Sequence, residues 1–250
     1  MNKMIGIVGG VGSYAGLDLI RKIYDLTGAR SDQEHLPVSM LSIPHKILDR
    51  SGFLAGEIDE NPAYSIAEII TSLHKTGAEI IGIPCNTAHA PQIFGTIVKS
   101  IPGECTVVHM IEEVASYIKE NFPDIKKVGV LSTNGTYFSN VYPATCSKFG
   151  IEVIQPSLEM QTVIVHPAIY DPYYGIKAQS NPPTDLAKSH LLFVASSLAS
   201  LGAEAIILGC TEIPLAIGQD RIGNSIVIDA TSILARALIK RSRENEPVHS

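Results

Sequence analysis

Gly77-Ala78-Glu79-Ile80-Ile81-Gly82-Ile83-Pro84-Cys85-Asn86-Thr87-Ala88-His89 sets the architecture of this chain. It begins as a short apolar run, the pattern of a buried strand, and it ends in a polar turn that carries a cysteine. A second stretch, Gly202-Ala203-Glu204-Ala205-Ile206-Ile207-Leu208-Gly209-Cys210-Thr211-Glu212, repeats the Gly-Ala-Glu start, the apolar run and a cysteine followed by a polar residue. Matched positions lie 125 residues apart, which is half of the 250-residue chain. The repeat predicts two similar halves, each with a cysteine at the same point.

The two halves also open alike. A strand at 5–8 leads into the glycine turn 9–12, and a strand at 127–131 leads into the polar turn 132–136. Strands alternate with helical patterns along the whole chain, which is typical of βαβ units and parallel sheets. The remaining predicted strands are 38–43, 78–83, 106–108, 151–154, 204–208 and 226–228, and predicted helices include 88–98, 136–149, 184–201 and 230–243.

These patterns predict an α/β fold of two similar Rossmann-like subdomains with parallel sheets, related by a pseudo-twofold axis. The first subdomain would comprise residues 1–112 plus 226–250 and carry Cys85, and the second would comprise 113–225 and carry Cys210. Parallel sheets bind ligands at the carboxyl ends of their strands, where both cysteine turns lie. We therefore expect the active site in the cleft between the subdomains, with one cysteine from each.

Composition narrows the function. The net charge of -6 argues against a nucleic-acid binder, because no basic excess exists to displace counterions from phosphates. The chain has no uninterrupted apolar run of about 18–20 residues and no signal-peptide pattern, so we expect no membrane association. Four cysteines without a dense framework fit free thiols in a reducing compartment. The sequence predicts a cytoplasmic protein.

Two stretches resemble cofactor- or metal-binding motifs, but each lacks the neighbouring residues that such a site needs. Gly10-Val11-Gly12-Ser13-Tyr14-Ala15 fits a loose dinucleotide fingerprint, but the next strand ends at Ile43 and Pro44 without the acid that would hold a ribose. Cys85 and His89, like Cys105 and His109, have a C-x-x-x-H spacing, but a structural zinc site usually has a tighter cysteine pair. We expect neither a cofactor nor a metal, and we interpret Cys146 as a packing residue.

We expect Cys85 and Cys210 to have more than a packing role. A free cysteine is usually buried in a core, but these two lie beyond their apolar runs, among polar residues. A helix N-terminus after each cysteine would lower the thiol pKa by favouring the thiolate. A redox disulfide between the two thiols is the alternative that the spacing leaves open.

Pro84-Cys85-Asn86-Thr87-Ala88-His89 together with Gly209-Cys210-Thr211-Glu212 resembles the cofactor-independent aspartate/glutamate racemase family. The Ile-Gly-Ile-Val-Gly-Gly start and the stretch 131–136 match the family's pattern too, so that the resemblance covers about 4–235. The Cys-Thr-Glu form and the stretch 173–177 resemble the aspartate racemase branch. At 9–13 the chain has Gly-Gly-Val-Gly-Ser where the family commonly has Gly-Gly-Met-Gly-Pro.

The resemblance implies a homodimer that racemises an amino acid, most closely aspartate, with Cys85 and Cys210 as the two acid/base residues. Racemisation removes a proton from one face of a carbon and returns one to the other face, so that two opposed thiols suit it. An acidic protein needs local cations for a dicarboxylic substrate, and Arg50 and Lys177 are the candidates. The other candidate substrate-binding residues are Gly10, Asn86, Thr87, Thr133, Thr211 and Glu212. His89 would either tune Cys85 or be a solvated helix histidine, and 170–183 would form a lid.

Four alternatives stay open. Within the family, the substrate range could be broad or directed at glutamate. In other classes, the chain could be a small-acid binding protein or a nicotinamide-dependent dehydrogenase. The missing ribose-binding acid disfavours the dehydrogenase, and the two cysteines disfavour a protein that only binds.

Overall fold

The computed structural model describes residues 2–244 and contains two sheets. The first has the order β2-β1-β3-β4 and is parallel throughout, and the second has the order β6-β5-β7-β9-β8, with only β8 antiparallel. The strands are β1 (Met4–Gly9), β2 (Val38–Ser42), β3 (Ala78–Gly82), β4 (Thr106–Val107), β5 (Lys127–Ser132), β6 (Glu152–Ile154), β7 (Ala205–Gly209), β8 (Arg221–Ile222) and β9 (Ser225–Asp229). The predicted α/β class with parallel sheets is confirmed.

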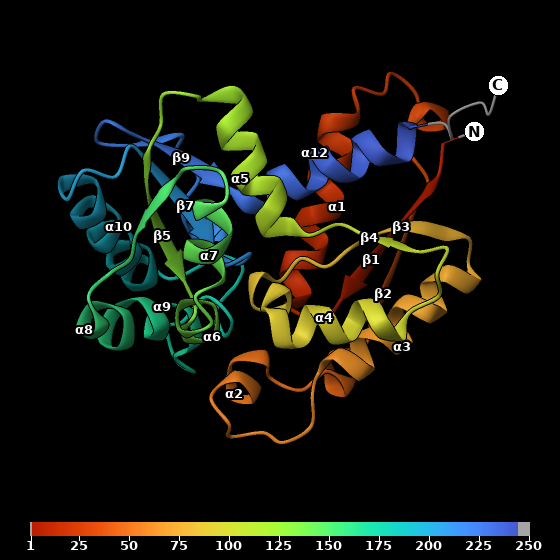
Figure 1. Cartoon of the computed structure of the whole chain (residues 1–250), viewed down its shortest axis with the longest axis horizontal. Coiled ribbons are helices and arrows are strands. Elements are labelled where there is room, and N and C mark those ends of the chain that lie inside the picture. The colour runs from red at the N-terminus through yellow and green to blue at the C-terminus, as the bar shows by residue number, and fades with distance from the viewer. Residues whose placement is uncertain (1, 245–250) are drawn as a thin grey trace.

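Helices surround both sheets, and the sheets lie side by side in Figure 1. The helices are α1 (Ser13–Thr27), α2 (Arg50–Leu54), α3 (Ala63–Lys75), α4 (Pro91–Ser100), α5 (Met110–Asn121), α6 (Asn134–Phe138), α7 (Val141–Ser147), α8 (Leu158–Met160), α9 (His166–Tyr170), α10 (Asp185–Ser200), α11 (Ile213–Ala216) and α12 (Ala230–Arg243). Short 3-10 turns cover Asp32–Glu34, Pro44–Lys46 and Asn86–His89, and a π-helical turn covers Gln161–Val165. No helix in the described part of the chain is long and apolar enough to cross a membrane.

The sequence repeat has a structural counterpart in each sheet. β3 pairs with β1, and β7 pairs with β5, so that each repeated strand lies beside the strand that opens its half. Gly77 and Gly202, which begin the two copies, have φ angles of 98° and 96°. Glycine adopts this left-handed conformation without steric cost, and at both positions it ends a helix and turns the chain into the strand. The backbone conformation at these two positions therefore explains why both copies of the repeat begin with glycine.

The two halves share part of their hydrophobic core. One buried cluster takes side chains from both sheets and from the helices between them, including Ile7 of β1, Ile111 of α5, Ile207 of β7 and Leu238 of α12. Figure 1 shows α5 and α12 crossing between the two sheets. Two further clusters lie within single halves, one under α10 and one under α3 and α4. The relative position of the halves is thus fixed by burial of apolar side chains.

Two details differ from the sequence prediction. β9 pairs with β7 in the second sheet, although the sequence pattern places residues 226–250 in the first subdomain. The chain returns to the first half only with α12, which packs along α1, so the subdomain boundaries stay a prediction. The helix expected over 136–149 is broken into α6 and α7, because Asn140 between them is left-handed with a φ of 56°.

Candidate active site

The two predicted cysteines line one cavity. Cys85 follows β3 and precedes the turn Asn86–His89, while Cys210 follows β7 directly. Their exposed fractions are 7% and 5%. The cavity is lined by Val11, Arg50, Cys85, Asn86, Thr87, Thr133, Tyr170, Lys177, Gly209, Cys210, Thr211 and Glu212. Because both strands of the repeat end at this cavity, the parallel topology explains why thiols 125 positions apart meet there.

The cavity is almost closed. The volume inside it that a water molecule can occupy is only about 10 Å³. That volume is of the order needed for a single water molecule. An amino acid can therefore enter only when the walls of the cavity move apart.

Glu212 connects the Cys210 thiol to a lysine. The thiol donates a hydrogen bond to Glu212 Oε2 at 3.0 Å, and Lys177 Nζ donates to Glu212 Oε1 at 2.6 Å. Burial pushes the pKa of Glu212 upward, but Lys177 and the hydrogen bonds hold it below its ordinary value. Burial likewise lowers the pKa of Lys177, but Glu212 and Cys210 outweigh burial and raise it. The pair is therefore ionised.

Cys210 is a thiol in this environment. Burial raises its pKa well above the ordinary value, and the neighbouring Glu212 carboxylate raises it further against the opposing charge of Lys177. The expectation that a helix N-terminus lowers this pKa is therefore wrong. α11 has only four residues and begins three positions later, so its dipole is too weak to offset burial and a nearby carboxylate.

Arg50 brings a buried cation to the Cys85 side. Its guanidinium donates to the carbonyl oxygens of Leu48 and Val11, both at 3.1 Å, and its Nε has no hydrogen-bond partner among residues 2–244. Burial lowers the pKa of Arg50, but the facing Cys85, Tyr170 and Asp49 outweigh burial and raise it. No carboxylate among the described residues forms an ion pair with Arg50, so its charge is available to an anionic ligand.

Polar side chains from both halves meet on the cavity wall. Thr87 Oγ1 lies 3.0 Å from Thr133 Oγ1 and 2.9 Å from Thr136 Oγ1, which join the two halves. Thr211 Oγ1 donates to the carbonyl oxygen of Pro84 at 2.9 Å and so ties one cysteine turn to the other. Asn86 is 2% exposed, and its Nδ2 has no partner within the described chain. Unpaired buried donors of this kind are costly unless a ligand uses them.

The glycine turn after β1 approaches the cavity from behind Glu212. Gly10 has a φ of 83°, and a Cβ there would lie 2.8 Å from Pro44 N. A side chain on Gly12 would collide with the Glu212 carboxylate. The turn is therefore built for close packing, and the carboxylate that it faces would repel a pyrophosphate. Ser13, where the sequence departs from the family pattern, is exposed and does not line the cavity.

His89 is buried against the backbone of the Cys85 turn. It is fully buried, with Nδ1 2.9 Å from the Cys85 carbonyl oxygen and Nε2 3.3 Å from the Val108 carbonyl oxygen. Burial, with His109 nearby, lowers its pKa to about 3, so that it is neutral at physiological pH. A neutral imidazole has one N–H, so His89 donates to one of these two backbone carbonyl oxygens, and its ring nitrogens face the backbone rather than the thiol. Cys146 lies in the shared core, as expected for a packing residue.

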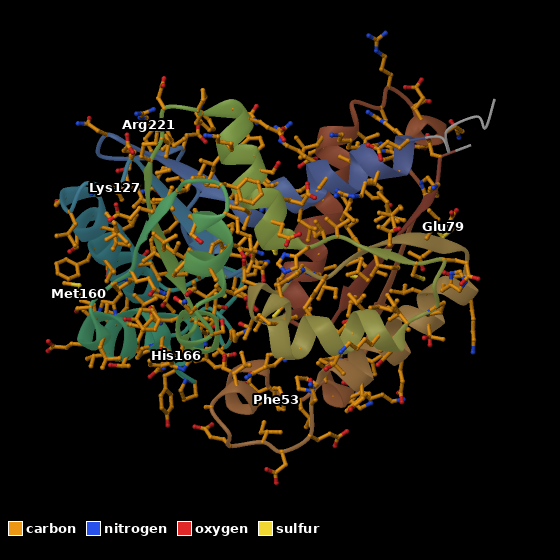
Figure 2. All side chains as sticks on the ribbon, in the orientation of Figure 1. Phe53, Glu79, Lys127, Met160, His166 and Arg221 are labelled. Atoms are coloured by element: carbon orange, nitrogen blue, oxygen red, sulfur yellow. The ribbon has the colours of Figure 1, made fainter. Side chains whose placement is uncertain are left out.

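Two segments cover the cavity. Lys177 and Tyr170 come from the stretch that we expected to be a lid, and α2 brings Arg50 from the opposite side. Tyr170 joins the two segments, because its hydroxyl donates to Asp49 Oδ2 at 2.9 Å. Beyond Tyr170 lies a more open cavity between α2 and α9, lined in part by His166. Figure 2 shows His166 at the edge of the second half and Phe53 on α2.

Comparisons with known proteins agree on one family. The broad specificity amino-acid racemase RacX of Bacillus subtilis (strain 168) is 28% identical over 242 residues, which are 94% of this chain and 96% of that protein. The structure of an aspartate racemase from Picrophilus torridus is 29% identical, with a TM-score of 0.79 over 97% of this chain and 95% of that one. A family model described as Asp/Glu/Hydantoin racemase matches residues 8–238. The chain belongs to this family.

Its fold is the two-domain fold of these racemases. An aspartate racemase homologue from Pyrococcus horikoshii OT3 is 26% identical, with a TM-score of 0.73 over 98% of this chain and all of that one. The family match and the similar racemases together identify the protein as an amino-acid racemase. They do not separate aspartate specificity from a broader range, because relatives of both kinds match.

The sequence-predicted residues can be compared with the lining of this cavity, although their roles stay predictions. Of the ten predicted residues, all except Gly10 line the cavity. Val11, Tyr170 and Gly209 were missed as lining residues. Tyr170 lies within the segment expected to be a lid, so its tyrosines and lysine were a usable signal. Val11 and Gly209 gave no signal, because neither side chain carries a polar or ionisable group.

Proposed function

We propose that this racemase interconverts L-aspartate and D-aspartate without a cofactor, with Cys85 and Cys210 as its two acid/base residues. The observation that supports this most is that the two thiols, one from each half, line the same closed cavity. A planar carbanion formed between two opposed thiols can be reprotonated on either face.

The proton inventory follows from the charges around each thiol. Cys210 is a thiol that donates a hydrogen bond to Glu212, and Cys85 faces the Arg50 guanidinium across the cavity. In one direction the Cys85 thiolate removes the α-proton, and Cys210 donates its proton to the opposite face. In the other direction the roles exchange. Each turnover therefore leaves one thiolate and one thiol.

The weak acidity of the α-proton makes electrostatic stabilisation the central requirement. Negative charge moves onto the substrate's α-carboxylate as the proton leaves, and donors in a buried site stabilise it strongly. Among the side chains that line the cavity, Asn86 Nδ2 and Arg50 Nε are buried donors without a hydrogen-bond partner in residues 2–244. Hydroxyl groups of Thr87, Thr133 and Thr211 add polar lining to the same wall.

The charged side chains in the cavity indicate which amino acids could bind there. Arg50 and Lys177 provide two cations for a dicarboxylic amino acid, which is the basis for aspartate. A broad substrate range is the second candidate, and the Lys177–Glu212 ion pair favours it. Lys177 already has a carboxylate partner, which leaves Arg50 as the cation free to bind one substrate carboxylate. Aspartate binding would then require its side-chain carboxylate to share Lys177 with Glu212.

The decisive experiment incubates the protein with L-aspartate in heavy water, without added cofactor. Wild type is expected to incorporate α-deuterium and to form D-aspartate. Cys85→Ser and Cys210→Ser should each abolish racemisation, whereas Cys105→Ser, outside the cavity, should leave it unchanged. Wild-type rates in both cavity variants would refute the two-base mechanism, and no exchange across acidic and neutral amino acids would refute the activity.

The substrate is decided by comparing aspartate with alanine in Arg50→Ala and Lys177→Ala. If both cations bind the side-chain carboxylate, each substitution raises KM for aspartate far more than for alanine. Equal effects on both substrates would support the broad range. We also infer, from the family resemblance, a cytoplasmic homodimer, which light scattering and cell fractionation test.

A further inference from the structure

Asn86 is held from the opposite half of the molecule. Its Oδ1 accepts a hydrogen bond from the hydroxyl of Tyr142 at 2.7 Å. Asn86 follows Cys85 in the first half, whereas Tyr142 lies on α7 in the second. The bond leaves the other end of the amide, Nδ2, without a partner in the described residues. Asn86 lines the cavity and Tyr142 does not, so the tyrosine acts from behind the wall.

Tyr142 is itself rigidly held. It is 1% exposed, and a Cβ added to Gly209 would lie 3.1 Å from its Cε2 atom, so its ring packs directly against the residue before Cys210. Burial raises the pKa of its hydroxyl well above the ordinary value, which keeps the proton in place. One rigid side chain therefore contacts the backbone beside Cys210 and the side chain beside Cys85.

The amide of Asn86 has two orientations that differ in what faces the cavity. In the observed one, Tyr142 donates to Oδ1, and the NH₂ group is left for a ligand. In the flipped one, the NH₂ would face Tyr142, the hydroxyl proton would lose its acceptor, and a carbonyl oxygen would face the substrate. An unsatisfied buried donor is costly, and a carbonyl oxygen repels a carboxylate. The hydroxyl thus selects the orientation that binds an anion.

We propose that Tyr142 is a positioning residue of this racemase: its hydroxyl fixes the Asn86 amide so that Nδ2 donates to a carboxylate of the amino-acid substrate. The inference rests on the proposed function, because it assumes that the substrate occupies this cavity. It adds a residue that does not touch substrate and that belongs to the half carrying the other cysteine. Binding at the Cys85 turn therefore depends on the second half.

The test is a double-mutant cycle of Tyr142→Phe and Asn86→Ala, with kcat and KM measured in both directions. Tyr142→Phe keeps the ring against Gly209 and removes the hydroxyl. We expect kcat/KM to fall by about 10- to 100-fold in the wild-type background and by less than about 2-fold in the Asn86→Ala background. Tyr137→Phe is the matched control, because its hydroxyl donates to the Pro156 carbonyl oxygen at 3.1 Å, away from the cavity. It should keep wild-type kinetics.

Two outcomes would overturn the proposal. Wild-type kcat/KM in Tyr142→Phe, with Asn86→Ala impaired, would show that the hydroxyl does not position the amide. If Tyr142→Phe lowered kcat/KM equally in the wild-type and Asn86→Ala backgrounds, the tyrosine would act through general packing. The same conclusion would follow if Tyr142→Phe destabilised the fold in both backgrounds. Thermal unfolding of all four proteins supplies the second measurement. Failure of the proposed function is distinct, since wild type itself would then show no α-proton exchange.

Discussion

Glu212→Gln removes the charge that organises the Cys210 side of the cavity while keeping nearly the same shape. In the native protein the carboxylate is 3% exposed, pairs with Lys177 and accepts a hydrogen bond from the Cys210 thiol. The substitution leaves the lysine partly buried beside a neutral amide. It also removes the negative charge that raises the Cys210 pKa.

The expected loss of stability is large. Two unit charges 2.6 Å apart attract by about 6 kcal/mol at an effective dielectric constant of about 20, before desolvation is subtracted. Removal of one partner from a buried pair costs about 3–5 kcal/mol. For a chain of this length, that free-energy change lowers the melting temperature by about 6–20 °C. Glu113→Gln, which breaks the more exposed 2.5 Å pair with Arg241, should cost under about 1 kcal/mol.

The kinetic effect has a direction. Without the carboxylate, the pKa of Cys210 falls, because the remaining charge of Lys177 favours the thiolate. The reaction in which Cys210 must donate a proton therefore declines at lower pH than in wild type, and the opposite reaction begins at lower pH. Both shifts are measured as pH profiles of kcat/KM with each enantiomer as the substrate.

The proposed role of the Glu212 charge is refuted if Glu212→Gln and Glu113→Gln melt within about 2 °C of each other and the pH profiles of both directions coincide with wild type. A shift of both profiles to higher pH would also refute it, since the sign of the charge effect would be reversed. Thermal melts and kinetics on the same protein preparations separate the loss of folding from the change in thiol chemistry.

Two further predictions concern the surroundings of the cavity. The pKa of His89 is about 3 in the folded protein and about 6.5 when unfolded, so its stability contribution is present above pH 6.5 and lost as pH falls, by about 1.4 kcal/mol per pH unit. Urea unfolding from pH 7 to 4 should show a shallower decline in His89→Phe than in wild type, and parallel declines would contradict this. Gly12→Ala places a methyl group against the Glu212 carboxylate at a φ of 141°, and should cost about 1–3 kcal/mol and reduce kcat/KM at least about 10-fold. The control is Gly95→Ala on α4, which has open space and should be neutral or stabilising in thermal unfolding, and equal melting of both variants would refute the steric argument.

The repeat makes much of the fold predictable. A short apolar run after a Gly-Ala-Glu start indicates a buried parallel strand, and parallel topology places residues after such strands at one edge of the sheet. Sequence pattern alone therefore assigns Cys85, Asn86, Cys210 and Glu212 to a common site. The strand 226–228 is also predictable, although its sheet is not, because pairing partners depend on the path of the chain between strands.

What the sequence could not provide was contact between distant side chains. Tyr142 lies on a helix that the sequence places only approximately, and nothing near it in the chain points to Asn86. The expected pKa of Cys210 is wrong in direction because burial and Glu212 outweigh a short helix. Both errors arise from the same cause: local pattern indicates the element on which a residue lies, but not the charges that another element brings to it.

The hydrogen bonds from Thr211 to Pro84, from Tyr142 to Asn86 and between Thr87 and Thr133 span the two halves at the wall of the cavity. The same atoms therefore set both the cohesion of the halves and the spacing of the thiols. A substitution that tightened this seam for thermal resistance would alter the gap across which a proton must be delivered. Engineering for heat tolerance is better directed to the packing of α12 on α1, where a gain in rigidity leaves the reacting groups where they are.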